Sequence, residues 1–528
     1  MRVPLTPLEF RRRAETLFGG KVGVVDGEKR FTYAEFGERS RRLAAAIRAL
    51  GVRPGGAVSF LTYNTHHLLE GYYGVLQAGA VLNPINIRLH PTDIAYVLNH
   101  AESRVLFFHR DFAPMVEAMR GGLETVKHFV VLEPEGPPPS AAAEYEALLA
   151  AAAPLRTDPE VDENSVAELF YTSGTTGRPK GVALTHRSLN LHALYSIISK
   201  RLGDATVHLH VVPMFHVNGW GAPHTITAVG GTHVLLRRID PVEILRLVQA
   251  ERVTDLYAVP AIFNAIVNHP EFGKYDLRSL RLLMSGGAPP APALVAAMLD
   301  KFGCEAFVGY GLTETSPVLT LARPKAHLQH EPPERQLERR TRTGYPILGV
   351  EVRVVDENGR DVSADGVAVG EIVARSNVVM DGYFKDPQGT AAAIRDGWFH
   401  TGDMANIDAE GYVNIVDRKK DIIISGGENI SSVQIENTLY AHPAVFECAV
   451  IPVPDDRWGE VPKALVVLKP GAAVTEAEIL EFCRERLAGF MVPKSVEFLD
   501  ALPKGGTGKI LKGELRDKYW AGQSRRVH

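Results

Sequence analysis

The residues best suited to chemistry lie in one short run, Tyr171 to Gly181, made almost wholly of glycine, hydroxyl side chains and cations. Apolar residues flank the run, which predicts a strand, a tight loop and a second strand. Glycine lets backbone N–H groups approach a ligand closely, and the polar side chains add donors and positive charge, so the loop suits a polyphosphate. It is not a Walker A loop, because Pro179 precedes Lys180 and glycine follows it. The simpler alternative is a flexible surface hairpin.

Length and composition indicate a globular protein of two or more domains. The 528 residues exceed what one hydrophobic core of about 250–300 residues accommodates. The net charge of -4, from 58 basic and 62 acidic residues, gives no electrostatic footprint for nucleic acid. The three cysteines (Cys304, Cys448 and Cys483) are too far apart for a disulfide framework or a cysteine-based zinc site, and they fit a reducing compartment. With no signal-peptide pattern and no membrane-length apolar stretch, we expect a cytoplasmic protein.

Alternating strand and helix patterns through the first two thirds of the chain predict parallel sheets covered by helices. Two expected strands, Leu280 to Met284 and Ala306 to Val308, end in glycine turns. Because open parallel sheets bind ligands beyond the carboxyl ends of their strands, these turns predict a binding site. Glu314 follows the second turn. It is a candidate functional acid, although on local sequence alone the favoured reading is an acid that stabilises a helix N-terminus.

A further strand, expected at Val207 to Val212, leads into a loop that holds His216 beside Trp220. One polar side chain among large apolar ones is typical of a ligand pocket. The alternative is a structural histidine with its hydrogen bonds satisfied. An alanine-rich helix is expected from Ala141 to Ala153, on the surface.

The C-terminal third changes character. From Gly344 to Val416 short β-rich runs alternate with turns, which predicts a small barrel or antiparallel sheet. A charged segment follows, and capping-box patterns then begin at Ser431 and Thr475 and predict two helices of a small α+β unit. Near its end, a glycine-rich loop carries Lys509, for which a solvated cation is the simpler reading.

The predicted fold class is therefore α/β, with a large N-terminal domain of parallel, helix-covered sheets and a small mobile α+β C-terminal domain. We place the first domain at residues 1–418, including a β-rich subdomain at about 344–416, and the second at residues 419–528. A polar hinge, Asp417 to Asp421, is predicted between them, because its charges suit a solvent-exposed swivel.

Five motifs in order resemble the adenylate-forming superfamily, which contains acyl-CoA synthetases, adenylation domains and firefly luciferase. They are Tyr171–Gly181, Tyr310–Glu314, Thr401–Asp403, Asp417-Arg418 with Lys420, and Thr507–Lys509. The resemblance covers essentially the whole chain. Three phrases look most like bacterial medium- and long-chain fatty acyl-CoA synthetases: Val212–Trp220, Thr313–Pro317 and Ser425–Ser431.

The resemblance implies an ATP-dependent fatty acid–CoA ligase. A carboxylate and ATP would give acyl-AMP and diphosphate, and CoA would then give acyl-CoA and AMP. The implied cofactors are ATP, Mg²⁺ and coenzyme A as a co-substrate, and the implied assembly is a homodimer. The implied catalytic residues are Lys509, His216 and Glu314, and the implied magnesium ligands are Thr172 and Glu314.

The resemblance also implies that Lys420 is the hinge residue, and it assigns binding residues. Those for the nucleotide and CoA are Thr172, Ser173, Gly174, Thr175, Thr176, Gly177, Lys180, Gly287, Ala288, Gly309, Tyr310, Gly311, Thr313, Asp403, Arg418, Lys420, Gly426 and Gly427. Those for the acyl substrate are His216, Val217, Trp220 and Gly287. Two positions depart from the family pattern, since Ile424 stands where many relatives have lysine and Val308 where close relatives often have glutamine.

Several alternatives stay open. On the same scaffold, the substrate could be an aryl acid or a short thioether acid. An adenylation enzyme that passes its acyl group to a carrier protein is disfavoured by the CoA-type segment around Gly426, and a luciferase-like oxygenase is a remoter alternative. From a different class, the chain could be an inactive nucleotide-binding protein, which the retained Lys180, Glu314, Asp403 and Lys509 argue against.

Overall fold

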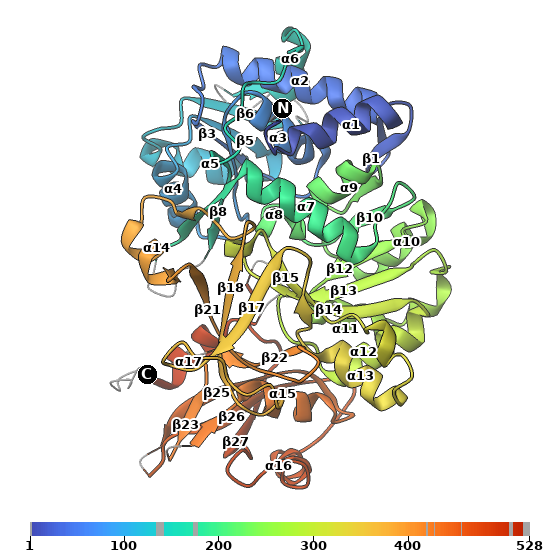
Figure 1. Ribbon diagram of the computed structural model, residues 1–528, viewed down its shortest axis with the longest axis vertical. Coiled ribbons are helices and arrows are strands. Elements are labelled where there is room, and N and C mark those ends of the chain that lie inside the picture. Colours follow the sequence, from blue (N-terminus) through green and yellow to red (C-terminus); the bar gives the residue numbers. More distant parts are fainter. Residues whose placement is uncertain are drawn as a thin grey trace.

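The computed structural model describes residues 3–133, 142–172, 178–418, 421–426, 428–455, 457–505 and 510–520. Within these ranges the chain forms two large, mostly parallel sheets, a smaller antiparallel sheet and a C-terminal α+β unit (Figure 1). The C-terminal unit, coloured orange to red, lies at the bottom of the view. The predicted α/β class is confirmed.

The first large sheet carries the predicted glycine turns. Its strand order is β16-β15-β14-β13-β12-β10-β11-β1-β2. The pairs from β14 to β1 are parallel, and the outer pairs are antiparallel. The strands are β1 (Val22–Asp26), β2 (Lys29–Thr32), β10 (Val207–His210), β11 (Thr232–Leu235), β12 (Asp255–Ala258), β13 (Leu282–Gly286), β14 (Glu305–Gly311), β15 (Val318–Leu321) and β16 (Tyr345–Pro346).

The second large sheet carries the phosphate-loop candidate. Its order is β19-β9-β8-β4-β3-β5-β6-β7. The strands are β3 (Ala57–Leu61), β4 (Val81–Pro84), β5 (Val105–His109), β6 (His128–Leu132), β7 (Ala143–Glu144), β8 (Val166–Thr172), β9 (Lys180–Thr185) and β19 (Gly382–Tyr383). Because β8 and β9 pair antiparallel, the two predicted strands on either side of the loop are confirmed. The edge strand β19 comes from a segment about two hundred positions later in the chain.

Helices cover both sheets, as the alternating pattern predicted. α2 (Tyr33–Ala49) and α3 (His66–Gln77) pack on one face of the second sheet, and α4 (Pro91–His100) and α5 (Ala113–Met119) on the other. α10 (Pro241–Glu251), α11 (Pro260–Val267) and α12 (Pro292–Phe302) cover the first sheet. The others before the C-terminal unit are α1 (Leu8–Phe18), α6 (Tyr145–Ala151), α7 (His186–Lys200), α8 (Val217–Trp220), α9 (Ala222–Val229), α13 (Pro333–Thr341) and α14 (Pro387–Ala393).

The alanine-rich helix is shorter and less superficial than predicted. It is α6, and Tyr145 and Leu149 on it belong to the main core cluster. The Tyr145 hydroxyl donates a hydrogen bond of 2.6 Å to the buried Glu70. The surface prediction was wrong at these two positions, because alanine content concealed one aromatic anchor that needs a buried acceptor.

The C-terminal third contains an antiparallel sheet, one of the two forms predicted for the β-rich segment, and the predicted α+β unit. The antiparallel sheet consists of β17 (Val350–Val355), β18 (Gly370–Ser376), β20 (Ile394–Arg395), β21 (Trp398–Ile407) and β22 (Val413–Arg418). The α+β unit consists of β23 (Ile423–Ser425), β24 (Glu428–Ile430), α15 (Ser432–Tyr440), β25 (Val445–Asp455), β26 (Gly459–Leu468), α16 (Glu476–Arg484), β27 (Ser495–Phe498) and α17 (Lys512–Trp520).

Both predicted helix starts in this unit are confirmed. Ser431 caps α15 by accepting a bond from the Gln434 backbone N–H. Thr475 and Glu478 form a complete capping box at α16. The division into two domains and the hinge at Lys420 stay predictions, since residues 419 and 420 lie outside the described ranges. Among the described residues, no helix is long and apolar enough to cross a membrane.

Candidate active site

The predicted adenine-binding turns lie side by side at the carboxyl ends of two neighbouring parallel strands. In the β13–β14 pair, Gly286 is the register partner of Gly309. A Cβ at Gly286 would lie 2.8 Å from the backbone carbonyl oxygen of Gly309, so the close approach of the two strands requires glycine at Gly286. Gly287 has φ of +78°, and Ala288, which follows it, is half-buried. Gly287 is exposed, whereas Gly309 on the neighbouring strand is buried.

Tyr310, Asp403 and Arg418 meet although they come from three different strands. The Tyr310 hydroxyl donates to Oδ2 of Asp403 at 2.7 Å, and Nε of Arg418 lies 3.4 Å from Oδ1. Asp403 and Arg418 are register partners on β21 and β22. Burial and the adjacent Asp403 charge raise the pKa of Tyr310 well above its usual value, so the hydroxyl stays protonated and donates. The structure thus joins the predicted adenine contact to both predicted ribose contacts.

Glu314 lies in a short 3-10 turn after β14, next to the buried Thr313. Its carboxylate accepts a hydrogen bond of 3.0 Å from the Tyr383 hydroxyl. Its backbone carbonyl accepts another, of 2.8 Å, from the Met380 N–H. Burial raises the pKa of the Glu314 carboxyl above its usual value. A half-buried carboxylate whose side-chain donor is the neutral Tyr383 hydroxyl is stabilised by a nearby cation, so its environment fits the predicted magnesium ligand.

The base of the phosphate-loop candidate is held by a ladder pair, Thr172 on β8 opposite Lys180 on β9. The Lys180 ammonium lies 3.1 Å from Oδ2 of Asp386 and 5.0 Å from the centroid of the Tyr383 ring. The loop residues between the strands that were predicted to bind phosphate lie outside the described residues: Ser173, Gly174, Thr175, Thr176 and Gly177.

The predicted acyl-site residues occupy an unusual turn after β10. His216 has extended backbone, and Val217, Asn218, Gly219, Trp220 and Gly221 then all have positive φ. Such a run is unfavourable for residues with side chains, and strain of this kind concentrates at ligand sites. The turn directs the Trp220 indole toward β13, where a Cβ on Gly286 or Gly287 would lie 3.0 or 3.6 Å from its ring. Trp220 and Gly287 therefore meet as predicted.

Gly311 is the last residue of β14. A Cβ at this position would lie 1.6 Å from the carbonyl oxygen of Pro317, so the chain can fold back toward β15 only with glycine here.

The C-terminal unit supplies the remaining predicted residues, and most of them cannot be placed. Lys509, Lys420 and Gly427 lie outside the described residues. Gly426 is described: its N–H donates to the Trp458 carbonyl at 2.9 Å, and its φ is +60°. The Trp458 ring packs against Gly426, leaving no room for a Cβ.

Three contact residues were not predicted from the sequence: Tyr383, Asp386 and Trp458. Asp386 had a readable signal, since Asp-Pro is a common helix start and Asp386 caps α14 through the Gly389 N–H. Tyr383 had none, because it reaches Glu314 only when β19 joins the edge of the second sheet. Trp458, 42% exposed, stood out only as a large aromatic beside glycine, with Arg457 over its ring.

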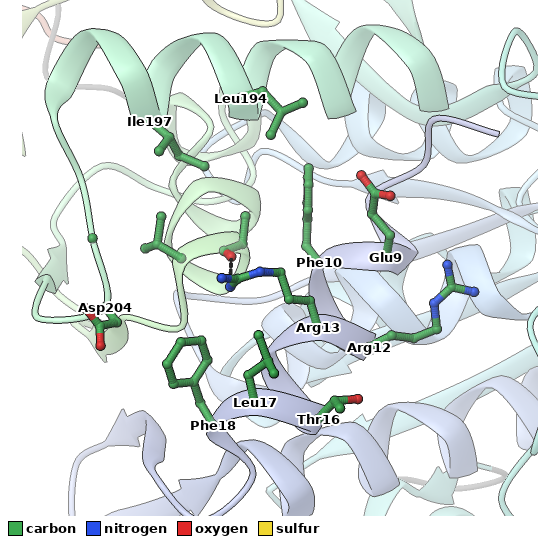
Figure 2. Close-up of a pocket in the computed structure, with 13 residues that line it drawn as sticks. Glu9, Phe10, Arg12, Arg13, Thr16, Leu17, Phe18, Leu194, Ile197 and Asp204 are labelled. Carbon is green, nitrogen blue, oxygen red and sulfur yellow. Dashed lines mark hydrogen bonds between the residues drawn. The ribbon is translucent and has the colours of Figure 1, made fainter. Parts of the chain in front are cut away.

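A separate surface groove lies between α1 and α7 (Figure 2). Phe10, Leu17 and Leu194 line it, and Arg13 crosses it to donate to the Ala228 carbonyl at 2.8 Å. It contains none of the predicted site residues, and polar groups do not converge in it as they do around Asp403.

Comparison with known proteins identifies the class. The family model described as AMP-binding enzyme matches residues 10–384, and that described as AMP-binding enzyme C-terminal domain matches residues 434–509. The chain therefore belongs to the AMP-binding enzymes, and the predicted adenylate-forming superfamily is confirmed.

Several of the similar proteins are CoA ligases. A long-chain-fatty-acid–CoA ligase of Thermus thermophilus is 43% identical over 97% of this chain and 95% of its own length. A 3-methylmercaptopropionyl-CoA ligase of Ruegeria lacuscaerulensis is 39% identical over 93% and 92%. Among solved structures, an anthranilate CoA ligase in complex with anthranoyl-AMP has a TM-score of 0.90, with 27% identity over 98% of both chains. The predicted enzyme class, an AMP-forming acid–thiol ligase, is confirmed at the level of the family.

Proposed function

We propose that this protein is an ATP-dependent CoA ligase for a medium- or long-chain fatty acid. It would join a carboxylate to AMP with release of diphosphate and then transfer the acyl group to CoA with release of AMP. The observation that carries the proposal is the convergence of Tyr310, Asp403 and Arg418 beside Glu314, Tyr383 and Lys180 at the ends of β13 and β14. The 43% identity with a fatty-acid ligase supports the choice of acid.

Different described residues would contact the ribose, the adenine and the phosphates of the nucleotide. The Asp403 carboxylate would accept hydrogen bonds from the ribose hydroxyls, with Arg418 beside it. Turns at Gly287–Ala288 and Gly309–Tyr310 would frame the adenine. Lys180 and the hydroxyl-rich loop would contact the leaving phosphates, where cations and oriented donors offset the negative charge that a carboxylate nucleophile must approach. In the structure Lys180 forms an ion pair with Asp386, and the phosphates of ATP would replace Asp386 as its partner.

Glu314 and Thr172 would hold Mg²⁺ through oxygen atoms, which suit this hard cation. The ion would neutralise phosphate charge. The half-buried carboxylate of Glu314, with its raised pKa, fits this task.

CoA would reach the acyl-AMP past the C-terminal unit. Gly426 and the exposed Trp458 with Arg457 beside it form a flat apolar surface next to a cation. These groups suit a pantetheine chain and a phosphate, respectively. Lys509 would act in the first half-reaction, and rotation about Lys420 would exchange it for the Gly426 segment in the second.

The test is AMP release with ATP, Mg²⁺ and CoA across acids from acetate to palmitate and across several aryl acids. We expect the highest kcat/KM for an aliphatic acid of medium or long chain. Repeating the assay without CoA, with hydroxylamine as the trap, separates a ligase from an enzyme that only adenylates. No AMP with any acid would favour the inactive nucleotide-binding alternative.

A second substrate class has specific support. The anthranilate ligase shares the fold closely, and the thioether-acid ligase is 39% identical. An aryl or short thioether acid is therefore the alternative, and a preference for either in the same assay would replace the fatty acid.

We also propose a homodimer in the cytoplasm. The family resemblance supports the first, and the unpaired Cys304, Cys448 and Cys483 support a reducing compartment. Light scattering after size exclusion tests the assembly, and a monomer at micromolar concentration would contradict it.

A further inference from the structure

Two adjacent histidines, His66 and His67, open helix α3, and each is 1% exposed. Nδ1 of His66 lies 2.6 Å from Oδ2 of Asp26, and the His66 backbone N–H donates to the same oxygen at 3.1 Å. A carboxylate can only accept, so the His66 proton is on Nδ1 and the lone pair is on Nε2. Nε2 has no hydrogen-bond partner among the described residues.

His67 also has a ring nitrogen without a hydrogen-bond partner among the described residues. Its Nδ1 is buried and unpartnered within the described residues, and its Nε2 lies 3.9 Å from Glu146. The two histidine rings are 3.8 Å apart between centroids. Two neighbouring buried imidazoles, each with a nitrogen that has no partner among the described residues, require an explanation such as an ion.

Glu133 supplies a third ligand atom directly after β6. One ligating atom from each of His66, His67 and Glu133 lies within 4.8 Å of the others. Arg237 donates to both Glu133 oxygens at 2.6 Å. The guanidinium fixes the carboxylate, and the second lone pair of Oε1, which now faces Lys29 at 3.4 Å, would be the one that a metal takes.

The fold brings these groups together from two sheets. Asp26 ends β1 and Arg237 follows β11 in the first sheet, whereas His66 follows β3 and Glu133 follows β6 in the second. Carboxyl ends of parallel strands are where such folds collect ligands. In Figure 1, β1, β3 and β6 lie in the upper part of the molecule, above β14 and β21 of the candidate active site.

We propose that His66, His67 and Glu133 bind a zinc ion that ties the two parallel sheets together, with Asp26 orienting His66. Two imidazoles and one carboxylate are a zinc-type ligand set, with bonds of about 2.0–2.2 Å. The Asp26–His66 pair is the carboxylate–histidine arrangement that supports metal-bound imidazole.

The surrounding charges allow a dication. The Asp26 and Glu133 carboxylates face Arg237, the His109 ring 3.6 Å from Glu133, and Lys29, which is 3.4 Å from Glu133. Lys29 is 50% exposed, so it can turn to solvent when the ion binds. The site lies apart from Glu314 and adds a structural metal to an enzyme that uses Mg²⁺ at the nucleotide.

The test uses tag-free full-length protein, stripped with a chelator and titrated with Zn²⁺. We expect one zinc per chain by elemental analysis after dialysis, a higher melting temperature, and no displacement by excess Mg²⁺, which prefers oxygen ligands. The Co²⁺-loaded protein should show visible ligand-field absorption, a readout independent of activity.

Variants assign the ligands. His67→Gln should raise the zinc Kd at least tenfold and remove the thermal shift, and Asp26→Asn should raise the Kd by about 10- to 100-fold. His330→Gln, at an exposed histidine, is the matched control and should change neither. Circular dichroism checks folding, and Glu133→Gln replaces His67→Gln if the latter unfolds. Wild-type protein that retains no zinc, or equal affinity in the ligand variants, overturns the proposal.

Discussion

The Tyr383 hydroxyl donates a 3.0 Å hydrogen bond to Oε1 of Glu314, and the Tyr383 ring lies 5.0 Å from the Lys180 ammonium. One side chain thus contacts both the proposed magnesium ligand and the proposed phosphate cation. Burial raises the pKa of Tyr383 above its usual value, so the hydroxyl is a donor throughout the working pH range. The bond fixes one Glu314 oxygen and lowers the pKa of this carboxyl, whereas burial, the larger effect, raises it.

Tyr383→Phe should therefore weaken Mg²⁺ binding. Loss of a bond that orients a metal ligand costs about 10- to 100-fold in metal affinity. The pKa of Glu314 should rise further, and since only the ionised carboxylate binds the cation, the acid limb of the rate–pH profile should move to higher pH. The measurements are the Mg²⁺ dependence and the pH profile of AMP release. Tyr63→Phe is the control, because Tyr63 makes a 3.0 Å bond to the exposed Asp111. An unchanged Mg²⁺ dependence would contradict the role.

Asp403→Asn should raise the KM for ATP about 10- to 100-fold, the cost of hydrogen bonds to a charged group. The KM for the acid should change little, because Asp403 contacts Tyr310 and Arg418 on the nucleotide side. Steady-state kinetics with each substrate varied in turn measure this split. Asp361→Asn removes a surface carboxylate that pairs with Arg353 and should have no effect. Equal rises for ATP and acid would indicate damage to the fold.

Gly311→Ala should destabilise the protein and abolish activity together. The new Cβ would lie 1.6 Å from the Pro317 oxygen, so the backbone between β14 and β15 must move. Overpacking of this kind costs about 1–3 kcal/mol or more. Thermal unfolding and ATP binding measure the two effects. Gly121→Ala, where a Cβ meets nothing within 4 Å, is the control. Wild-type stability in Gly311→Ala would show that the turn is looser than the structure indicates.

Hydrophobic periodicity and helix-capping residues were enough to predict much of the fold. Helix α16 begins at the Thr475–Glu478 box because that box satisfies free N–H groups locally. What a local pattern could not supply was pairing between distant segments. β19 joins β9, and β1 from the N-terminus pairs with β11. Tyr383 and the His66–Glu133 cluster arise from such pairings, so no single stretch of sequence signalled them.

In the candidate active site, too, features set by local motifs were predicted and features set by distant packing were not. Asp403 and Glu314 were predicted because they stand in motifs, and the structure places them near Tyr310 and Tyr383. The strain of the turn from Val217 to Gly221 was not predicted, because five positive φ values depend on packing of the Trp220 ring against Gly286.

Trp220→Leu should change acid selectivity more than turnover. The indole fills the space beside Gly287, and a smaller side chain opens it. Pocket size changes of this order alter discrimination by about 10-fold or more. We expect the ratio of kcat/KM for palmitate to that for butyrate to rise by about this factor, measured by AMP release. Trp398→Leu, on β21 between Arg353 and Arg375, is the control. An unchanged ratio would remove Trp220 from the acyl site.

Lys509→Ala should abolish acyl-AMP formation but leave thioester formation from supplied acyl-AMP largely intact. The proposed role of this lysine is to bridge the carboxylate and the α-phosphate as charge develops, which only the first half-reaction requires. Lys420→Pro should do the reverse, since a fixed φ stops rotation at the proposed hinge and stalls the enzyme after adenylation. Diphosphate release and thioester formation are measured separately in both variants. Equal loss of both half-reactions in Lys509→Ala would refute the division of labour, and normal turnover in Lys420→Pro would remove the hinge from this position.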